Sequence, residues 1–452
     1  MMKQKQHYKL HRFSRFQVLV SYYIFTVLLA ASLLSLPFAR QAGAKWSVMD
    51  AIFTAASAIS VTGLSTVVIH ETFTFSGIIL LLIFLQIGGI GIMAISTYFW
   101  LLLGRRIGLK QRRLIQTDQN QINLSGVVGL LRQILVLILL IELIGGFILG
   151  IYYLNYFPTW NEALLQGFFA SISATTNAGF DITGQSLIPF ANDYFVQFIT
   201  MILIILGAIG FPVWIEVKKY LFQRDEHNRF RFSLFTKITT STYFFLLVFG
   251  AIIIFIFEFS HFFADKKWHE ALFYSLFQST TMRSAGLSTL QFDELTVPTI
   301  LVMSVLMFIG ASPSSVGGGI RTTTFALNIL FLFHYAKGNT TIKIFKREIH
   351  QDDLMKSLVV LLLAVILWTS SVIILSITEN VSLIAIIFEV SSAFGTCGAS
   401  MGITPELSNI GKSLLIVLMF IGRVGILSFL LAIGGGEKKV DFHYPKERVI
   451  IG

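Results

Sequence analysis

The chain has 452 residues, of which 55% are hydrophobic and only 13% are charged. Its mean hydropathy is +0.76 and its formal net charge is +10. Soluble domains carry about 25% charged residues, so this composition excludes an ordinary soluble protein. Apolar runs at 16–38, 130–154 and 354–377 reach the length of roughly 20 residues that a membrane-spanning helix needs. A β-barrel would require alternating segments of roughly 10 residues, so we predict an all-α, multi-pass membrane protein.

Basic residues gather in short segments between the apolar runs, which is the positive-inside pattern and disfavours a nucleic-acid surface. If these segments all face the cytoplasm, both termini are cytoplasmic and the number of spans is even. The first apolar run is longer than the 7–15 apolar residues typical of a cleaved signal peptide, so we expect it to be retained as a span. Cys397 is the single cysteine, which excludes an internal disulfide. The basic segments are 3–15, 105–113, 218–231, 337–347 and 438–448.

A similar stretch recurs in the chain about every 110 residues. Each copy is a short apolar helical piece, then Ser or Thr, then a turn of small residues that contains one glycine. The apolar pieces are about 12 residues long, which is too short to cross a bilayer and suits a re-entrant half-helix. The copies are 46–66, 160–181, 268–289 and 382–402, with turn glycines Gly63, Gly179, Gly286 and Gly398.

A second block follows each turn at matched spacing, at 84–93, 203–212, 306–315 and 418–427. The two blocks together predict four parallel repeats, each made of a span (M1), a pore loop with its half-helix, and a second span (M2). We expect eight transmembrane helices around a pseudo-fourfold pore. The predicted boundaries are 1–110, 111–230, 231–350 with an intramembrane loop, 351–434, and a cytoplasmic C-terminal tail at 435–452.

Turns at membrane depth have a chemical consequence. Irregular backbone is tolerated there only where it is buried in protein or lines a watery cavity. Turns that converge on one axis present carbonyl oxygens that can replace the hydration shell of a cation. Glycine permits the positive φ that such turns need, and the C-terminal ends of the half-helices carry partial negative charge. The pattern therefore predicts a cation filter.

The turn sequences "VTGLS", "NAGFD", "SAGLS" and "SAFGTCGASMG", the last followed by "ITPEL", resemble the Trk/Ktr/HKT superfamily of potassium transporters. Within it they resemble the bacterial Ktr membrane subunit of the KtrB/KtrD type, over nearly the whole chain. The resemblance implies a selectivity filter with K⁺ at backbone carbonyls. Its residues are Val61, Thr62, Gly63, Asn177, Ala178, Gly179, Ser284, Ala285, Gly286, Thr396, Cys397 and Gly398.

The third repeat differs from the others because "ASPSSVGGGIRTTTF" (311–325) follows its second span. Proline and three glycines disfavour a continuous helix there. The resemblance implies an intramembrane gating loop below the filter; the alternative is a simple kink packed against another helix. The implied gate residues are Ala311, Ser312, Pro313, Ser314, Ser315, Gly317, Gly318 and Gly319, together with Arg423 of the fourth repeat.

Charged residues inside apolar spans need partners. For Arg423 the alternative to a gate role is an ion pair with a buried carboxylate, Glu142 or Glu389. Arg283 flanks the third turn, and we expect it to bond a carboxylate and so hold a half-helix.

The resemblance further implies K⁺ as the transported ion, often with a dependence on Na⁺ as activator, and no covalently bound cofactor. It implies a homodimer in the cell membrane, embedded in the lipid bilayer, and a separate cytosolic nucleotide-binding ring of the KtrA/KtrC type as regulatory partner. The sequence has no Walker A, H-E-x-x-H or G-x-S-x-G motif, so we do not expect an enzyme. The alternative function is an alternating-access carrier for a small organic solute, although such carriers more often use inverted repeats.

Overall fold

The structure is a computed structural model of the chain. It describes residues 15–91, 94–95, 97–98, 107–108, 112, 127–222, 230–339, 341–434 and 445.

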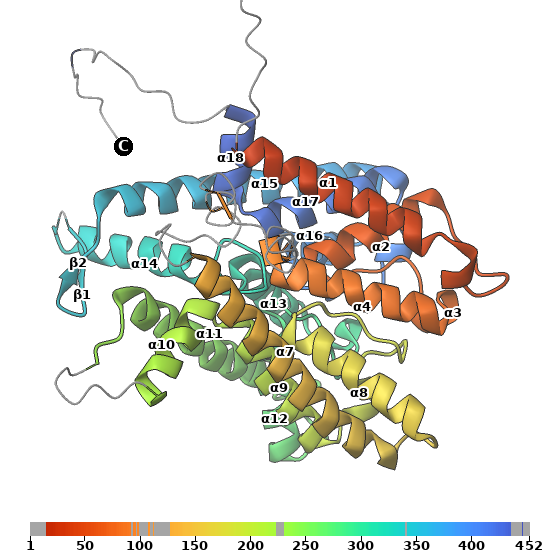
Figure 1. Cartoon of the computed structure of the whole chain (residues 1–452). Helices are drawn as coiled ribbons and strands as arrows, with labels where there is room; N and C mark the ends of the chain where they lie inside the picture. The colour runs from red at the N-terminus through yellow and green to blue at the C-terminus, as the bar shows by residue number, and fades with distance from the viewer. Residues whose placement is uncertain are drawn as a thin grey trace, which may run out of the picture.

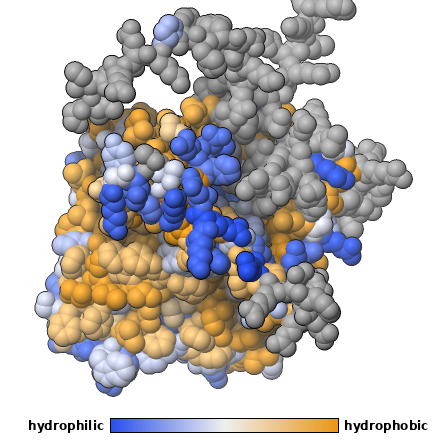
Figure 2. All heavy atoms as spheres, turned by 90° about the vertical axis from the view of Figure 1, so that its left-hand side faces the viewer, coloured by the Kyte–Doolittle hydropathy of each residue, from blue (hydrophilic) through white to orange (hydrophobic). Residues whose placement is uncertain are grey.

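Four of the described helices are long and apolar enough to cross a membrane. They are α1 (Arg15–Leu34), α7 (Val127–Tyr152), α11 (Leu234–Glu258) and α15 (Gln351–Thr378). Large apolar side chains on these helices are exposed, among them Phe25, Leu140, Phe245 and Leu362. Figure 2 shows broad hydrophobic areas around a hydrophilic centre on one face of the molecule. An apolar exterior of this kind is stable in lipid, which indicates that these helices face the bilayer.

A shorter helix follows each of these spans: α2 (Val48–Ser60), α8 (Trp160–Thr175), α12 (Trp268–Thr281) and α16 (Leu383–Gly395). The 13 residues of α2 cover only about 20 Å, which is less than the thickness of a hydrocarbon core. Ser47 caps α2 by accepting a hydrogen bond from the Asp50 N–H, and the Asp50 carboxylate accepts one from the Ser47 N–H. These helices match the predicted half-helices in position and approximate length.

Each half-helix and its turn are followed by a further apolar helix, here called the last helix of its set, and a glycine with positive φ lies one or two residues after its end. These helices are α4 (Phe75–Ile90), α9 (Tyr194–Ala208), α13 (Val297–Ile309) and α17 (Asn409–Val424). The glycines that follow are Gly91, Gly210, Gly310 and Gly425, with φ of 99°, 104°, 74° and 93°. The chain continues as α10 (Phe211–Phe222), α14 (Thr322–Ala336) and α18 (Ile426–Gly434). The sequence singled out only the third of these breaks; in the second set, α9 and α10 are bent by 100°.

The helices form four sets: α1, α2 and α4; α7, α8 and α9; α11, α12 and α13; and α15, α16 and α17. The last helix of each set packs against the half-helix of the next set, in the pairs α4–α8, α9–α12, α13–α16 and α17–α2. The last pair closes a circle. Figure 1 accordingly shows the first and fourth sets together above the second and third.

The remaining described elements are small. A two-stranded antiparallel pair, β1 (Lys343–Ile344) and β2 (Arg347–Glu348), connects α14 to α15, and the all-α prediction did not include it. The short helix α3 (Ile69–Thr72) lies between α2 and α4. Turns of 3-10 helix are η1 (Pro37–Ala39), η2 (Tyr153–Asn155), η3 (Ile188–Phe190), η4 (Phe292–Glu294) and η5 (Thr404–Glu406).

Candidate functional site

The half-helices end in turns of unusual backbone conformation. All four turn glycines have positive φ: 96° at Gly63, 68° at Gly179, 67° at Gly286 and 97° at Gly398. Three residues with side chains are left-handed as well, namely Val61, Asn177 and Thr396. Left-handed backbone is costly for residues other than glycine, so the surrounding structure must hold these turns in place.

The structure brings the four predicted turns to one place. A Cβ atom on Gly179 would lie 2.5 Å from Ala285 O, 3.2 Å from Cys397 O and 3.4 Å from Thr62 O. These carbonyls come from the third, fourth and first sets and belong to the residues that directly precede the turn glycines. A Cβ on Gly63 would overlap Ala178 O in the same way, which brings in the second set. The point beside Gly179 is thus surrounded by carbonyl oxygens from separate turns.

Hydroxyl groups at the ends of the half-helices brace the turns, a role that was not predicted from the sequence. The Oγ atoms of Ser57 and Ser392 accept hydrogen bonds from the turn glycines Gly63 and Gly398, each at 3.0 Å. Ser173 Oγ donates to Phe180 O at 2.6 Å, and Thr281 Oγ1 donates to Leu287 O at 2.7 Å. The signal was present in the sequence, because a Ser or Thr occurs near the end of every half-helix.

A cavity of about 470 Å³, here called the turn cavity, lies beside the turns. It is lined by the turn glycines and by residues that follow them in the sequence. All four turn glycines line it. So does the second residue after each glycine: Ser65, Asp181, Ser288 and Ser400. The turn cavity therefore leads to the ring of turns through polar side chains, one of them a carboxylate.

The predicted loop lies against the opposite side of the turns. A Cβ on Gly317 would lie 2.6 Å from the Cβ of Ser284, and one on Gly318 would lie 2.5 Å from Thr396 Oγ1. Ser284 and Thr396 both precede their turn glycines. Because Gly317 and Gly318 have no side chains, the loop backbone can approach the third and fourth turns closely.

The second set holds the loop by its backbone. The Ser312 N–H donates to Ala208 O at 3.1 Å, and the Val316 N–H donates to Gly207 O at 3.3 Å. The Phe211 N–H donates to Ser314 O at 2.9 Å. The break between α9 and α10 exposes the groups that make these bonds. The other predicted gate residues, Ala311, Pro313, Ser315 and Gly319, lie in the same loop segment, and Ala311 is fully buried.

Two arginines hold the carbonyls of the loop. Arg423 donates from Nη1 to Val316 O and from Nη2 to Gly88 O and Gly89 O, the last at 3.2 Å. It therefore links the fourth set, the loop and the first set. Arg321, which the sequence analysis did not single out, donates from Nη1 to Gly317 O and has a left-handed φ of 79°.

Two expectations about buried arginines need correction: the alternative ion pair of Arg423 and the carboxylate partner of Arg283. Glu142 accepts a hydrogen bond from Gln86 Nε2, and Glu389 accepts hydrogen bonds from two hydroxyl groups, so neither is the ion-pair partner of Arg423. The expectation that Arg283 bonds a carboxylate is wrong. Its Nη1 donates to Tyr243 O at 2.7 Å and its Nη2 donates to Gly310 O at 3.3 Å, while the guanidinium lies 3.8 Å from the centre of the Tyr243 ring.

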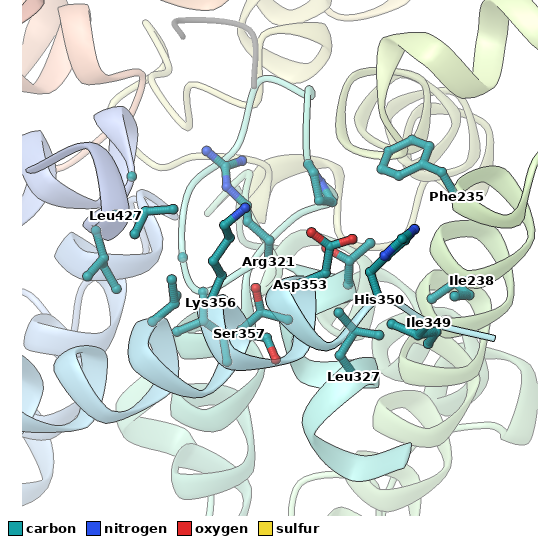
Figure 3. Close-up of a pocket in the computed structure, with 18 of the residues that line it drawn as sticks. Phe235, Ile238, Arg321, Leu327, Ile349, His350, Asp353, Lys356, Ser357 and Leu427 are labelled. Atoms are coloured by element: carbon teal, nitrogen blue, oxygen red, sulfur yellow. The ribbon is translucent and has the colours of Figure 1, made fainter. Parts of the chain in front are cut away.

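A second cavity, of about 480 Å³, lies against the other side of the loop and is here called the loop cavity. Pro313, Gly319 and Arg321 of the loop line it, together with residues of α11, α14, α15 and α18. Figure 3 shows Arg321, Lys356 and Asp353 between apolar side chains of α11 and α18. The turns and the loop thus separate two cavities.

Comparison with known proteins identifies the family. Residues 1–434 match the TrkH family, which is described as cation transport proteins. The chain belongs to this family. It is 58% identical over 436 residues to the Ktr system potassium uptake protein D of Bacillus subtilis, a match that covers 96% of this chain and 97% of that protein. The family resemblance inferred from the turn motifs is confirmed.

Other relatives of this TrkH-family chain are transporters too. It is 36% identical to the Ktr system potassium uptake protein B of B. subtilis, covering 98% of this chain and 97% of that protein. It is 32% identical to the potassium/sodium uptake protein NtpJ of Enterococcus hirae, covering 98% of both chains. The crystal structure of the potassium transporter TrkH from Vibrio parahaemolyticus shares its fold with a TM-score of 0.72 at 18% identity, covering 94% of this chain and 86% of that one. The chain is a helical membrane protein, and its relatives agree with a protein that is not an enzyme.

Proposed function

We propose that this chain is the ion-translocating membrane subunit of a bacterial Ktr-type K⁺ uptake system. The observation that carries the proposal is the arrangement of carbonyl oxygens around the point beside Gly179. The names of the relatives that the chain matches over nearly its full length, potassium uptake proteins D and B, support K⁺ as the ion.

In this proposal the ring of turns is the selectivity filter. A K⁺ ion enters the turn cavity, is attracted by Asp181, and loses water as the carbonyls of Thr62, Ala178, Ala285 and Cys397 replace its hydration shell. The four helix sets act as parallel repeats, with boundaries near residues 110, 230 and 350. The half-helices add the partial negative charge of their C-terminal ends, which favours a cation over an anion.

The loop acts as the gate. Its backbone approaches the third and fourth turns, and Arg423 ties it to the first set, so an ion that leaves the filter meets the loop before it reaches the loop cavity. The guanidinium of Arg423 repels a cation, and the loop has to move before K⁺ can pass. Ring subunits that bind nucleotide in the cytosol regulate this movement.

The remaining parts of the proposal follow the family. The turn cavity faces outside, the loop cavity faces the cytoplasm, and both termini are cytoplasmic in the cell membrane. Two copies form a homodimer in which each protomer has its own pore. Na⁺ acts as an activator, and the name of the potassium/sodium uptake relative supports a role for that ion.

The test is K⁺ uptake in a bacterial strain that lacks its own K⁺ uptake systems. Expression of the chain should restore growth at low K⁺, with a larger effect when a Ktr ring subunit is expressed beside it. Purified protein in liposomes should take up ⁸⁶Rb⁺, and excess external K⁺ should suppress that uptake far more than excess Na⁺. An organic-solute carrier would show neither result.

A further inference from the structure

Glu389 is a buried carboxylate that has no role in the ion path proposed above. It lies on the half-helix α16 and its side chain is fully buried. When the four sets are aligned by their turn glycines, the corresponding positions are Thr54, Ala170 and Phe277. Packing of a half-helix therefore does not require a carboxylate at this position, and an acidic group buried at membrane depth indicates a function.

The partners of Glu389 belong to the segment that follows the fourth filter turn. Its Oε1 accepts hydrogen bonds from Thr404 Oγ1 and from Ser400 Oγ, the latter at 3.2 Å. The two hydroxyls lie 3.0 Å apart, and the Gly402 N–H donates to Ser400 Oγ at 3.0 Å. Ser400 and Thr404 both line the turn cavity. One carboxylate oxygen thus ties both ends of the segment 400–404 to the half-helix.

The first and third turns are held differently at the position of Ser400. Ser65 Oγ donates to Val67 O, and Ser288 Oγ donates to Leu290 O, so each hydroxyl donates to backbone of its own segment. The half-helix α12 reaches Ser288 only through a neutral amide, since Gln278 Nε2 donates to Ser288 Oγ at 3.4 Å. Ser400 is the aligned residue in the fourth turn, and its hydroxyl instead donates to a carboxylate on the half-helix. The outer edge of the fourth turn therefore depends on Glu389 for its position.

We propose that Glu389 is a positioning residue for the fourth filter turn and that, by fixing the segment 400–404, it sets how strongly the filter prefers K⁺ over Na⁺. The inference rests on the proposed filter function. Only a few residues connect Glu389 to the filter. Its partner Ser400 is two residues after Gly398, and the Cys397 carbonyl is one of those around the point beside Gly179. Loss of the tie lets the Cys397 carbonyl move, and a displaced carbonyl replaces the hydration shell of K⁺ less well.

The structure offers a sharp pair of variants. Glu389 Oε2 has no hydrogen-bond partner among the described residues, so Glu389→Gln can place its amide NH₂ there and keep Oε1 as the acceptor. Glu389→Ala removes the acceptor altogether. In liposomes we expect Glu389→Ala to reduce the K⁺-over-Na⁺ preference of ⁸⁶Rb⁺ uptake by about tenfold, the effect of about 1.4 kcal/mol, while Glu389→Gln stays within about twofold of the wild type.

Two further sets of variants complete the test. The double variant Ser400→Ala with Thr404→Val removes the donors and should reproduce the loss of preference. Glu142→Ala is the matched control, because Glu142 is also buried and bonded, but to Gln86 and away from the turn cavity; its K⁺ preference should stay unchanged.

The outcomes separate the inference from the proposed function. If the wild type takes up no ⁸⁶Rb⁺, the proposed function is wrong. If the wild type transports and Glu389→Ala keeps its K⁺ preference, or Glu389→Gln loses as much as Glu389→Ala, the positioning role is wrong. If Glu389→Ala cannot be purified as a folded protein, the double variant decides: a normal preference there also overturns the inference.

Discussion

The substitution Gly179→Ala places a methyl group at the point where the carbonyls of the other turns meet. The new Cβ would lie 2.5 Å from Ala285 O, while carbon–oxygen contacts are comfortable only beyond about 3.3 Å. The turn must therefore move by about 1 Å, and alanine at a φ of 68° adds roughly 1–2 kcal/mol of backbone strain. The methyl also occupies space that we assign to the ion. Loss of even one carbonyl contact, at about 1–3 kcal/mol, lowers K⁺ preference by roughly tenfold or more.

The assay is uptake of ⁸⁶Rb⁺ into liposomes against competing K⁺ or Na⁺, with the purified variant reconstituted at equal density. The control is Gly129→Ala, since Gly129 lies in α7 and a Cβ there would meet no atom within 4 Å. The control should transport like the wild type. A folded Gly179→Ala protein with unchanged rate and unchanged K⁺ preference would refute the reasoning, because the methyl group would then lie in space that no ion uses.

Three other substitutions test the remaining parts of the account. Arg423→Ala removes the hydrogen bond from a charged group to the loop at Val316 O, worth about 1.5–3 kcal/mol, so the initial uptake rate should rise by roughly tenfold, and unchanged flux would argue against a gate. Asp181→Asn removes a charge from the turn cavity and should raise the K⁺ concentration for half-maximal uptake by about twofold at low ionic strength; an effect that persists undiminished at high salt would contradict an electrostatic role. Gly207→Ala would make a Cβ overlap Thr175 O, so the yield of monodisperse protein in size-exclusion chromatography should fall sharply, and a wild-type yield would show that the close approach of α9 to α8 is not needed.

Much of the fold could be predicted because its signals are local in the sequence. Long apolar runs predicted the spanning helices, and Pro313 with Gly317–Gly319 predicted the irregular loop. The half-helices were recognisable because each ends three to five residues before an aligned turn glycine. Their role in ion binding stays a prediction, although the structure brings the turns together.

The breaks after α4, α9 and α17 were harder to predict from the sequence than the loop after α13. Gly91, Gly210 and Gly425 lie inside apolar runs, each two or three residues after another glycine, and glycine is also frequent within membrane-spanning helices. Their φ values of 99°, 104° and 93° appear only in the folded structure. The loop supplies part of the reason, because the broken end of α9 provides the carbonyls of Gly207 and Ala208 to which the loop binds.

The partner predicted for Arg283, and the alternative partners considered for Arg423, were wrong for a physical reason. Sequence reasoning seeks a carboxylate for each buried guanidinium, but backbone carbonyls can satisfy it as well. Arg423 bonds to Gly88 O and Val316 O, which are remote in the chain and carry no side-chain signal. Such carbonyls are available only where helices end, as at the end of α4 and in the loop that follows α13.

The central claim is that a dehydrated cation occupies the point beside Gly179. The most direct measurement is the anomalous scattering of Rb⁺ or Cs⁺ in crystals of the protein grown with that ion in place of K⁺. The account predicts a peak bounded by the carbonyl oxygens of Thr62, Ala178, Ala285 and Cys397. Full electron density for the turns without a peak there, or a peak only at a site away from these carbonyls, would contradict it.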